Sequence, residues 1–211
     1  MDQLKPTEDQ PIVTRDYARE FILSFLVKSE YLLPGDRMNL PFFAKRLGCS
    51  VTPIREAFAQ LSHSGLVAVA PKRGFHIAAL DEKEADRLLH AIIGLESQAI
   101  LAAVPGQLDL RSLANANEAI RDANTPAERF FSDLRFHQEL ASFFDGSHIS
   151  ALLFEIKVRL YFYMKEYLST DTHTQQIIGI HTRIIRCLEG SDQQGAISAL
   201  RQNWLDVGLG F

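Results

Sequence analysis

The sequence predicts a mainly α-helical protein of two parts: a small N-terminal domain of helices with one β-hairpin, and a larger C-terminal antiparallel helical bundle. Short amphipathic segments alternate with turn signals up to about residue 68, and residues 65–77 resemble two short strands around a turn. Helical periodicity then continues to the C-terminus. With 211 residues and 46% hydrophobic content, the chain can bury two modest cores. We expect domains at residues 10–79 and 80–211.

Three helices are predicted in the N-terminal domain. Apolar residues at i, i+3 and i+4 predict a helix over residues 17–29, which the turn formed by Leu33, Pro34, Gly35 and Asp36 follows. A short helix over residues 42–47 ends at Gly48, which suits a left-handed stop. Helix, tight turn and helix therefore follow one another.

The third helix, over residues 51–62, has the properties of a DNA recognition helix. Ser50 is its expected N-cap, and its first turn accepts Pro53. Thr52 and Arg55 lie near its N-terminal end, where a recognition helix enters the major groove and its N–H groups favour phosphate. An ordinary surface helix is the alternative.

A hairpin follows, with Lys72, Arg73 and Gly74 at its tip. A cationic tip suits a minor groove, so helices and hairpin together predict a winged helix-turn-helix. The charge distribution agrees: the whole chain has a net charge of −4, but residues 10–79 carry nine Lys or Arg against five acids. Residues 80–211 hold twelve bases and eighteen acids. The N-terminal part is thus the better polyanion binder.

An ordered set of turn, helix, cap and wing signals resembles the winged-helix domain of the GntR family of transcription regulators. The match spans about seventy residues: Leu33-Pro34-Gly35-Asp36-Arg37, Ala44 to Gly48, Ser50 to Ala57, Leu61, Gly65-Leu66-Val67 and Arg73-Gly74. The resemblance implies DNA contacts from Arg37, Ser50, Thr52, Pro53, Arg55, Lys72, Arg73 and Gly74. Family members usually have an arginine where this chain has Val51, which cannot donate a hydrogen bond to guanine. We therefore expect a changed operator preference with DNA binding retained.

The C-terminal part resembles the all-helical effector domain of the FadR-type GntR subfamily. Its motifs are Leu95-Glu96, Asp133 to His137, Gly179-Ile180-His181, Leu188 to Asp192 and Ala199-Leu200-Arg201. Six or seven helices are expected, over residues 83–103, 109–124, 127–144, 149–167, 174–189 and 192–205. The aromatic residues dense between 160 and 167 are interpreted as core or dimer contacts.

A metal site is one interpretation of the polar residues in this domain. Asp133 and His137 lie four residues apart, which places a carboxylate and an imidazole on one helical face, and His181 is a third candidate ligand. The resemblance implies a fourth ligand from the last helix. Asn203 stands there in place of the usual histidine, and its neutral amide oxygen is a poorer ligand for zinc or nickel than imidazole, though acceptable to harder ions such as manganese. A polar pocket without metal is the alternative.

The resemblance further implies a small organic acid or sugar acid as effector, and Arg135, Arg159 and Asn203 are its candidate binding residues. Either arginine could equally be a solvated surface charge. One winged helix contacts only a short half-site, so we expect a homodimer on double-stranded operator DNA.

The function predicted is a transcription regulator, either repressor or activator, whose operator affinity a small effector controls. We expect a cytoplasmic protein that is not an enzyme and has no membrane partner, since neither a secretory signal nor a long apolar stretch is present. Two alternatives stay open: a metal-dependent enzyme, and a DNA-binding protein whose helical half only dimerises.

Overall fold

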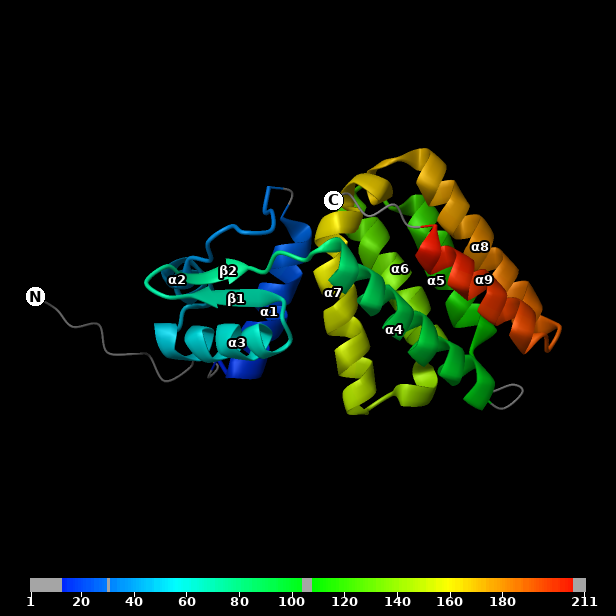
Figure 1. The fold of residues 1–211 in the computed structure, drawn as a ribbon, viewed down its shortest axis with the longest axis horizontal. Coiled ribbons are helices and arrows are strands. Elements are labelled where there is room, and N and C mark those ends of the chain that lie inside the picture. Colours follow the sequence, from blue (N-terminus) through cyan, green and yellow to red (C-terminus); the bar gives the residue numbers. More distant parts are fainter. Residues whose placement is uncertain (1–12, 30, 104–107, 207–211) are drawn as a thin grey trace, which may run out of the picture. The chain divides into compact units, whose positions relative to one another are not determined.

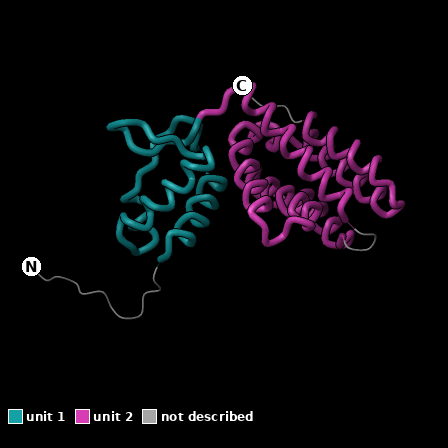
Figure 2. Tube along the Cα trace, turned by 60° about the horizontal axis from the view of Figure 1, so that its bottom comes forward, with its two compact units in different colours: residues 1–78 teal, residues 79–211 magenta. Residues whose placement is uncertain are grey.

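The computed structural model describes residues 13–29, 31–103 and 108–206, which form two compact units, residues 1–78 and 79–211 (Figure 2). Residues 10–12 and 207–211, at the outer ends of the expected domains, lie outside the described residues. The elements of the first unit are α1 (Arg15–Lys28), α2 (Leu40–Leu47), α3 (Val51–His63), β1 (Val67–Ala70) and β2 (Gly74–Ile77). Those of the second are α4 (Glu82–Ala102), α5 (Leu110–Asp122), α6 (Pro126–Leu140), the 3-10 turn η1 (Ser142–Phe144), α7 (His148–Ser169), α8 (Asp171–Glu189) and α9 (Gln193–Leu205).

The first unit is a winged helix-turn-helix, as predicted from the sequence. An aromatic cluster forms its core, with Phe43 of α2 packed edge-on against Phe58 of α3 at 5.4 Å between ring centroids. Asn39 caps α2, whose helix ends at Gly48 in the left-handed conformation (φ 65°) that glycine tolerates without strain. Strands β1 and β2 pair antiparallel, in a register that places Val67 opposite Ile77 (Figure 1).

The wing has an additional backbone partner that the sequence pattern did not predict. The Gly35 N–H donates to the Ile77 carbonyl and the Ile77 N–H donates to the Asp36 carbonyl, while the Met38 N–H donates to the Phe75 carbonyl. The residues after the first turn therefore run along β2 and close the outer edge of the hairpin. Arg37 lies at this edge with its side chain exposed.

The second unit is a helical bundle in which α8 packs against both α9 and α5, and α6 packs against both α5 and α7 (Figure 1). Its core contains Trp204, Tyr161 and Phe136, each at most 2% exposed. The aromatic run of α7 is core, as expected, because Leu160, Tyr161, Phe162, Met164 and Tyr167 are all buried. Among the described residues, no helix is long and apolar enough to cross a bilayer.

Candidate functional site

The exposed end of α3 carries the residues predicted to read DNA. Thr52 and Arg55 point to solvent, whereas Ile54 and Phe58 are buried against the rest of the unit. Ser50 occupies the N-cap position, but its side chain makes no capping hydrogen bond, contrary to the expectation from the sequence. Its hydroxyl and the first N–H groups of α3 are thus left for another acceptor or donor. Val51 is the first residue of the helix and is half-buried.

The wing tip is formed by a tight turn that keeps its cations outward. The Arg73 N–H donates to the Ala70 carbonyl, and Lys72 adopts a left-handed backbone conformation (φ 62°) that is uncommon for a residue other than glycine. Lys72, Arg73 and Gly74 are all exposed, while Pro53 of α3 is half-buried. Unit 1 therefore presents two cationic features, one on a helix end and one on a hairpin.

Asp133, His137 and His181 form a buried cluster in the second unit. A capping box of Thr125 and Glu128 fixes the start of α6, which presents Asp133 and His137 one turn apart, and α8 supplies His181. One ligand atom from each of the three lies within 4.8 Å of the other two. The Asp133 Oδ1 atom is 3.5 Å from His181 Nε2 and 3.8 Å from His137 Nε2.

The cluster leaves several polar atoms without hydrogen-bond partners among the described residues. Both ring nitrogens of His181 lack a hydrogen-bond partner. The imidazole instead stacks on the Phe136 ring, with 3.7 Å between the two ring centroids. Asn203 of α9 brings its Nδ2 atom to 3.3 Å from His137 Nε2, while its Oδ1 atom has no partner. A buried polar group without a partner costs about 1–3 kcal/mol, so these atoms fit a bound ion. The donor set of two imidazoles, a carboxylate and an amide oxygen also suits a divalent metal.

Burial sets the protonation of two members of the cluster. Burial, together with the nearby His137 and Lys157, lowers the pKa of His181 well below its usual range, so its imidazole is neutral and keeps a lone pair. Burial also raises the pKa of Asp133, an effect that His137 and Lys157 oppose. A cation between these residues would reverse that shift by favouring the carboxylate.

A second layer of polar residues orients His137. The Glu96 Oε2 atom of α4 accepts a hydrogen bond from His137 Nδ1 at 3.0 Å and another from Trp204 Nε1 at 2.8 Å. Because the ionised carboxylate can only accept, His137 carries a proton on Nδ1, and its Nε2 atom faces Asp133 and Asn203. A metal ion would be bound through Nε2.

Lys157 of α7 completes this layer. Its ammonium donates to Glu96 Oε1 and lies 5.6 Å above the Trp204 ring, with the side chain only 3% exposed. Although burial alone would raise the pKa of Glu96, His137 and Lys157 lower it to about 2. Glu96 is therefore a buried anion that depends on its two partners.

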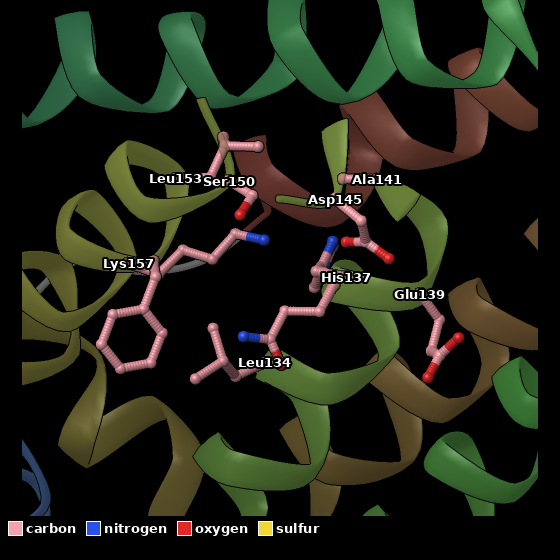
Figure 3. Close-up of a pocket in the computed structure, with 10 residues that line it drawn as sticks. Leu134, His137, Glu139, Ala141, Asp145, Ser150, Leu153 and Lys157 are labelled. Carbon is pink, nitrogen blue, oxygen red and sulfur yellow. The ribbon is translucent and has the colours of Figure 1, made fainter. Parts of the chain in front are cut away.

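A cavity of about 220 Å³ lies between α6 and α7, and His137 and Lys157 reach it from the protein interior (Figure 3). Its other lining residues are Leu134, Gln138, Glu139, Ala141, Asp145, Ser150, Leu153 and Phe154. His137 is the one member of the cluster that lines the cavity, and Asp133, His181 and Asn203 are not among its lining residues.

The two arginines that the sequence suggested for effector binding are not at this cavity. Arg135 is exposed on the opposite side of α6 from the buried residues Asp133 and His137, and Arg159 lies 3.8 Å from Glu84 of α4. Lys157 is the cation that reaches the cavity instead. In the sequence Lys157 and Arg159 alternate with Ile156, Val158 and Leu160, so no local signal separates the buried lysine from the arginine beside it.

Comparisons with known proteins agree with this two-part architecture. Residues 22–77 match the gntR family of bacterial regulatory proteins, and residues 84–204 match the FCD domain. The HTH-type transcriptional regulator YdhC of Bacillus subtilis is 25% identical over 202 residues, which cover 93% of this chain and 89% of YdhC.

Two solved structures share the fold. McbR/YncC of E. coli superposes with a TM-score of 0.74 at 20% identity, over 92% of this chain and 95% of that one. A GntR transcriptional regulator from Rhodococcus sp. RHA1 superposes with a TM-score of 0.68 at 20% identity, over 91% and 92% of the two chains. The chain therefore belongs to the GntR family of bacterial transcription regulators, with an FCD domain as its helical half.

Proposed function

We propose that this GntR-type regulator binds operator DNA as a homodimer and that a small carboxylate effector in its FCD domain changes the operator affinity. The observation that carries the proposal is the buried cluster of Asp133, His137 and His181 beside a cavity, in a chain whose other unit has an exposed, cationic α3 and wing. Two copies are proposed because one winged helix spans only a short half-site.

We further propose that the FCD domain holds one divalent metal ion. Asp133, His137 and His181 would bind it, and the amide oxygen of Asn203 would face it as a weak fourth ligand. The two imidazoles of such a ligand set suit zinc or nickel, and its carboxylate and amide oxygens are also acceptable to manganese. The ion would add a fixed positive charge next to His137, the one proposed ligand that also lines the cavity.

The full chain would test the proposal in two steps. First, a random-sequence DNA library is selected on the protein to obtain an operator. The affinity for that operator is then measured by fluorescence anisotropy with acetate, butyrate, malate and citrate, with zinc, nickel or manganese present. We expect at least one acid to change the operator Kd by roughly 5- to 150-fold, the usual range of coupling between two sites.

Three results would contradict the proposal. A selection that enriches no sequence would reject operator binding, and an operator affinity that no acid changes with any metal would favour a helical half that only dimerises. We propose that this regulator is not an enzyme. Turnover of an acid by the purified protein would contradict this and would support a metal-dependent enzyme.

The DNA contacts are tested by Arg55→Ala and Arg73→Ala. Each arginine is exposed, so we expect each variant to weaken operator binding by about 10- to 100-fold while the melting temperature stays nearly unchanged. Arg183→Ala is the matched control, since Arg183 is an exposed arginine of the FCD domain. A marked loss of thermal stability would instead make Arg55 or Arg73 a structural residue.

Helix α7 offers a route from the cavity to the segment that leads into α4. Phe154 and Lys157 line the cavity, while further along the helix the Tyr163 hydroxyl accepts a hydrogen bond from the Leu80 N–H, two residues before α4 begins. A ligand that displaces α7 would act on this hydrogen bond. An effector can shift an equilibrium only through such a difference between two arrangements.

Tyr163→Phe removes that hydrogen bond and keeps the ring. We expect operator affinity without effector to change little, and the effector-induced change in affinity to shrink by about 3- to 10-fold, since a typical hydrogen bond contributes about 0.5–1.5 kcal/mol. Anisotropy titrations with and without effector measure both quantities, and Tyr31→Phe, at an exposed tyrosine, is the control. An unaltered effector response in Tyr163→Phe would exclude this route.

A further inference from the structure

The cavity between α6 and α7 has groups of opposite charge at its two ends. Lys157 and His137 form its inner end, and both side chains are almost completely buried. Glu139 and Asp145 lie toward the outside, half-buried and exposed respectively. Figure 3 shows the Lys157 and His137 side chains extending toward the same space, with Asp145 beside it. The lining also contains the apolar side chains of Leu134, Leu153 and Phe154, together with Gln138 and Ser150.

The inner end lacks acceptors. The Lys157 ammonium has three N–H donors, and within the described part of the chain its only hydrogen-bond acceptor is Glu96. Two donors of a buried cation are thus left for a ligand at the cavity. Leaving them unmet is costly because water is largely excluded there, so an anionic group in the cavity would be stabilised.

The outer end lacks cations. Across residues 13–29, 31–103 and 108–206, neither the Glu139 nor the Asp145 carboxylate has an ion-pair partner. The positive charge of Lys157 is already balanced by Glu96, so the lining as a whole is acidic toward solvent. Glu139 and Asp145 would repel a ligand whose only charged group is a carboxylate. This repulsion weakens the binding of such a ligand.

We propose that the cavity binds a small zwitterion, with its carboxylate at Lys157 and its ammonium group facing Asp145 and Glu139. The inference rests on the proposed effector site and names the chemical class of the effector. Its size follows from the cavity, which at about 220 Å³ is below the roughly 300 Å³ at which pockets for drug-sized ligands begin. A molecule of the size of a simple amino acid fits this volume, and its methylene groups would contact Leu134, Leu153 and Phe154.

A series of unbranched amino acids tests the proposal on the full chain. Calorimetric titrations use glycine, β-alanine, γ-aminobutyrate and 5-aminovalerate, which differ in the separation of the two charges, with butyrate and n-butylamine as molecules of single charge. We expect one zwitterion to bind at least tenfold more tightly than butyrate or n-butylamine. The optimal length would report the distance between the two ends of the cavity.

Two variants separate the roles of the acids. Asp145→Asn and Glu139→Gln should each lower the affinity for the zwitterion that binds most tightly by about tenfold. Butyrate should bind with the same or higher affinity, because each substitution removes an unpaired negative charge. Asp122→Asn, at an exposed acid at the end of α5 and outside the cavity lining, is the control and should change neither.

The outcomes distinguish this inference from the proposed function. If butyrate binds as tightly as every zwitterion and changes operator affinity, the carboxylate effector stands and the zwitterion is rejected. If n-butylamine alone matches the best zwitterion, binding of a carboxylate at Lys157 is rejected. If no member of the series and no carboxylate binds, with or without metal, both the inference and the effector site fail.

Discussion

Replacing Lys157 with methionine is expected to lower the free energy of unfolding by about 3–5 kcal/mol, the range observed when one partner of a buried ion pair is removed. Glu96 would lose the cation that its carboxylate contacts at Oε1, in a position where its side chain is 0% exposed. At neutral pH it would either stay charged with His137 and Trp204 as its remaining partners or take up a proton. Urea denaturation followed by circular dichroism measures the loss.

A double variant distinguishes loss of charge balance from loss of packing. Glu96→Gln combined with Lys157→Met removes both charges, and we expect it to recover most of the stability that the single variant loses. Lys83→Met, at an exposed position near the start of α4, should change stability by less than about 0.5 kcal/mol. A Lys157→Met protein as stable as the unmodified chain would mean that the pair contributes nothing net.

Addition of a divalent metal to chelated protein is expected to raise the stability by about 4 kcal/mol when free metal reaches 1,000 times its Kd. The ion would bind the folded cluster of Asp133, His137 and His181, whose ligand atoms are within 4.8 Å of one another only in the native bundle. Elemental analysis of the purified protein and thermal shifts with zinc, nickel and manganese, before and after chelation, measure occupancy and stabilisation. Asp133→Asn should abolish both, whereas Asp122→Asn should abolish neither.

Absence of metal and of any thermal shift would contradict the metal site. Asn203 would then be part of a hydrogen-bonded network that replaces the ion, and Lys157 would be the only fixed cation at the cavity's inner end among the described residues. Ligands held by hydrogen bonds and by that ammonium would become the candidates for the effector.

Local signals in the sequence placed most helix ends within three residues, but the expected helix over residues 127–144 was wrong at its end, because α6 stops at Leu140 and residues 142–144 form the 3-10 turn η1. The expected helix over residues 83–103 differs by one residue at each end from α4, because Asp81 caps its start, and α2 ends at Gly48 as its left-handed conformation requires. The four-residue spacing of Asp133 and His137 likewise predicts that both lie on one face. Such features depend on neighbours within a helical turn.

Pairings between distant segments were not predictable in this way. Lys157 and Glu96 are 61 residues apart, and a lysine on a helix is usually solvated, so the ion pair becomes visible only when α4 and α7 are packed. The same holds for the backbone hydrogen bonds of Gly35 and Met38 to the wing, which no periodic pattern in the sequence predicts. Arg135, a candidate effector ligand by its sequence position, lies on the exposed face of α6 and not on the face that carries Asp133 and His137.

Trp204 is an intrinsic fluorescent probe of the interior of the FCD domain. It is the single tryptophan of the chain, its indole N–H donates to Glu96, and its ring centroid is 4.7 Å from that of His137. Its emission therefore comes from one place, beside the Lys157 ammonium, the Glu96 carboxylate and the His137 imidazole next to the proposed ligand site. Occupancy of this site can be followed in unlabelled protein by the intensity and wavelength of that emission, and ions with unpaired electrons, such as nickel and manganese, are distinguishable from zinc by the quenching they cause.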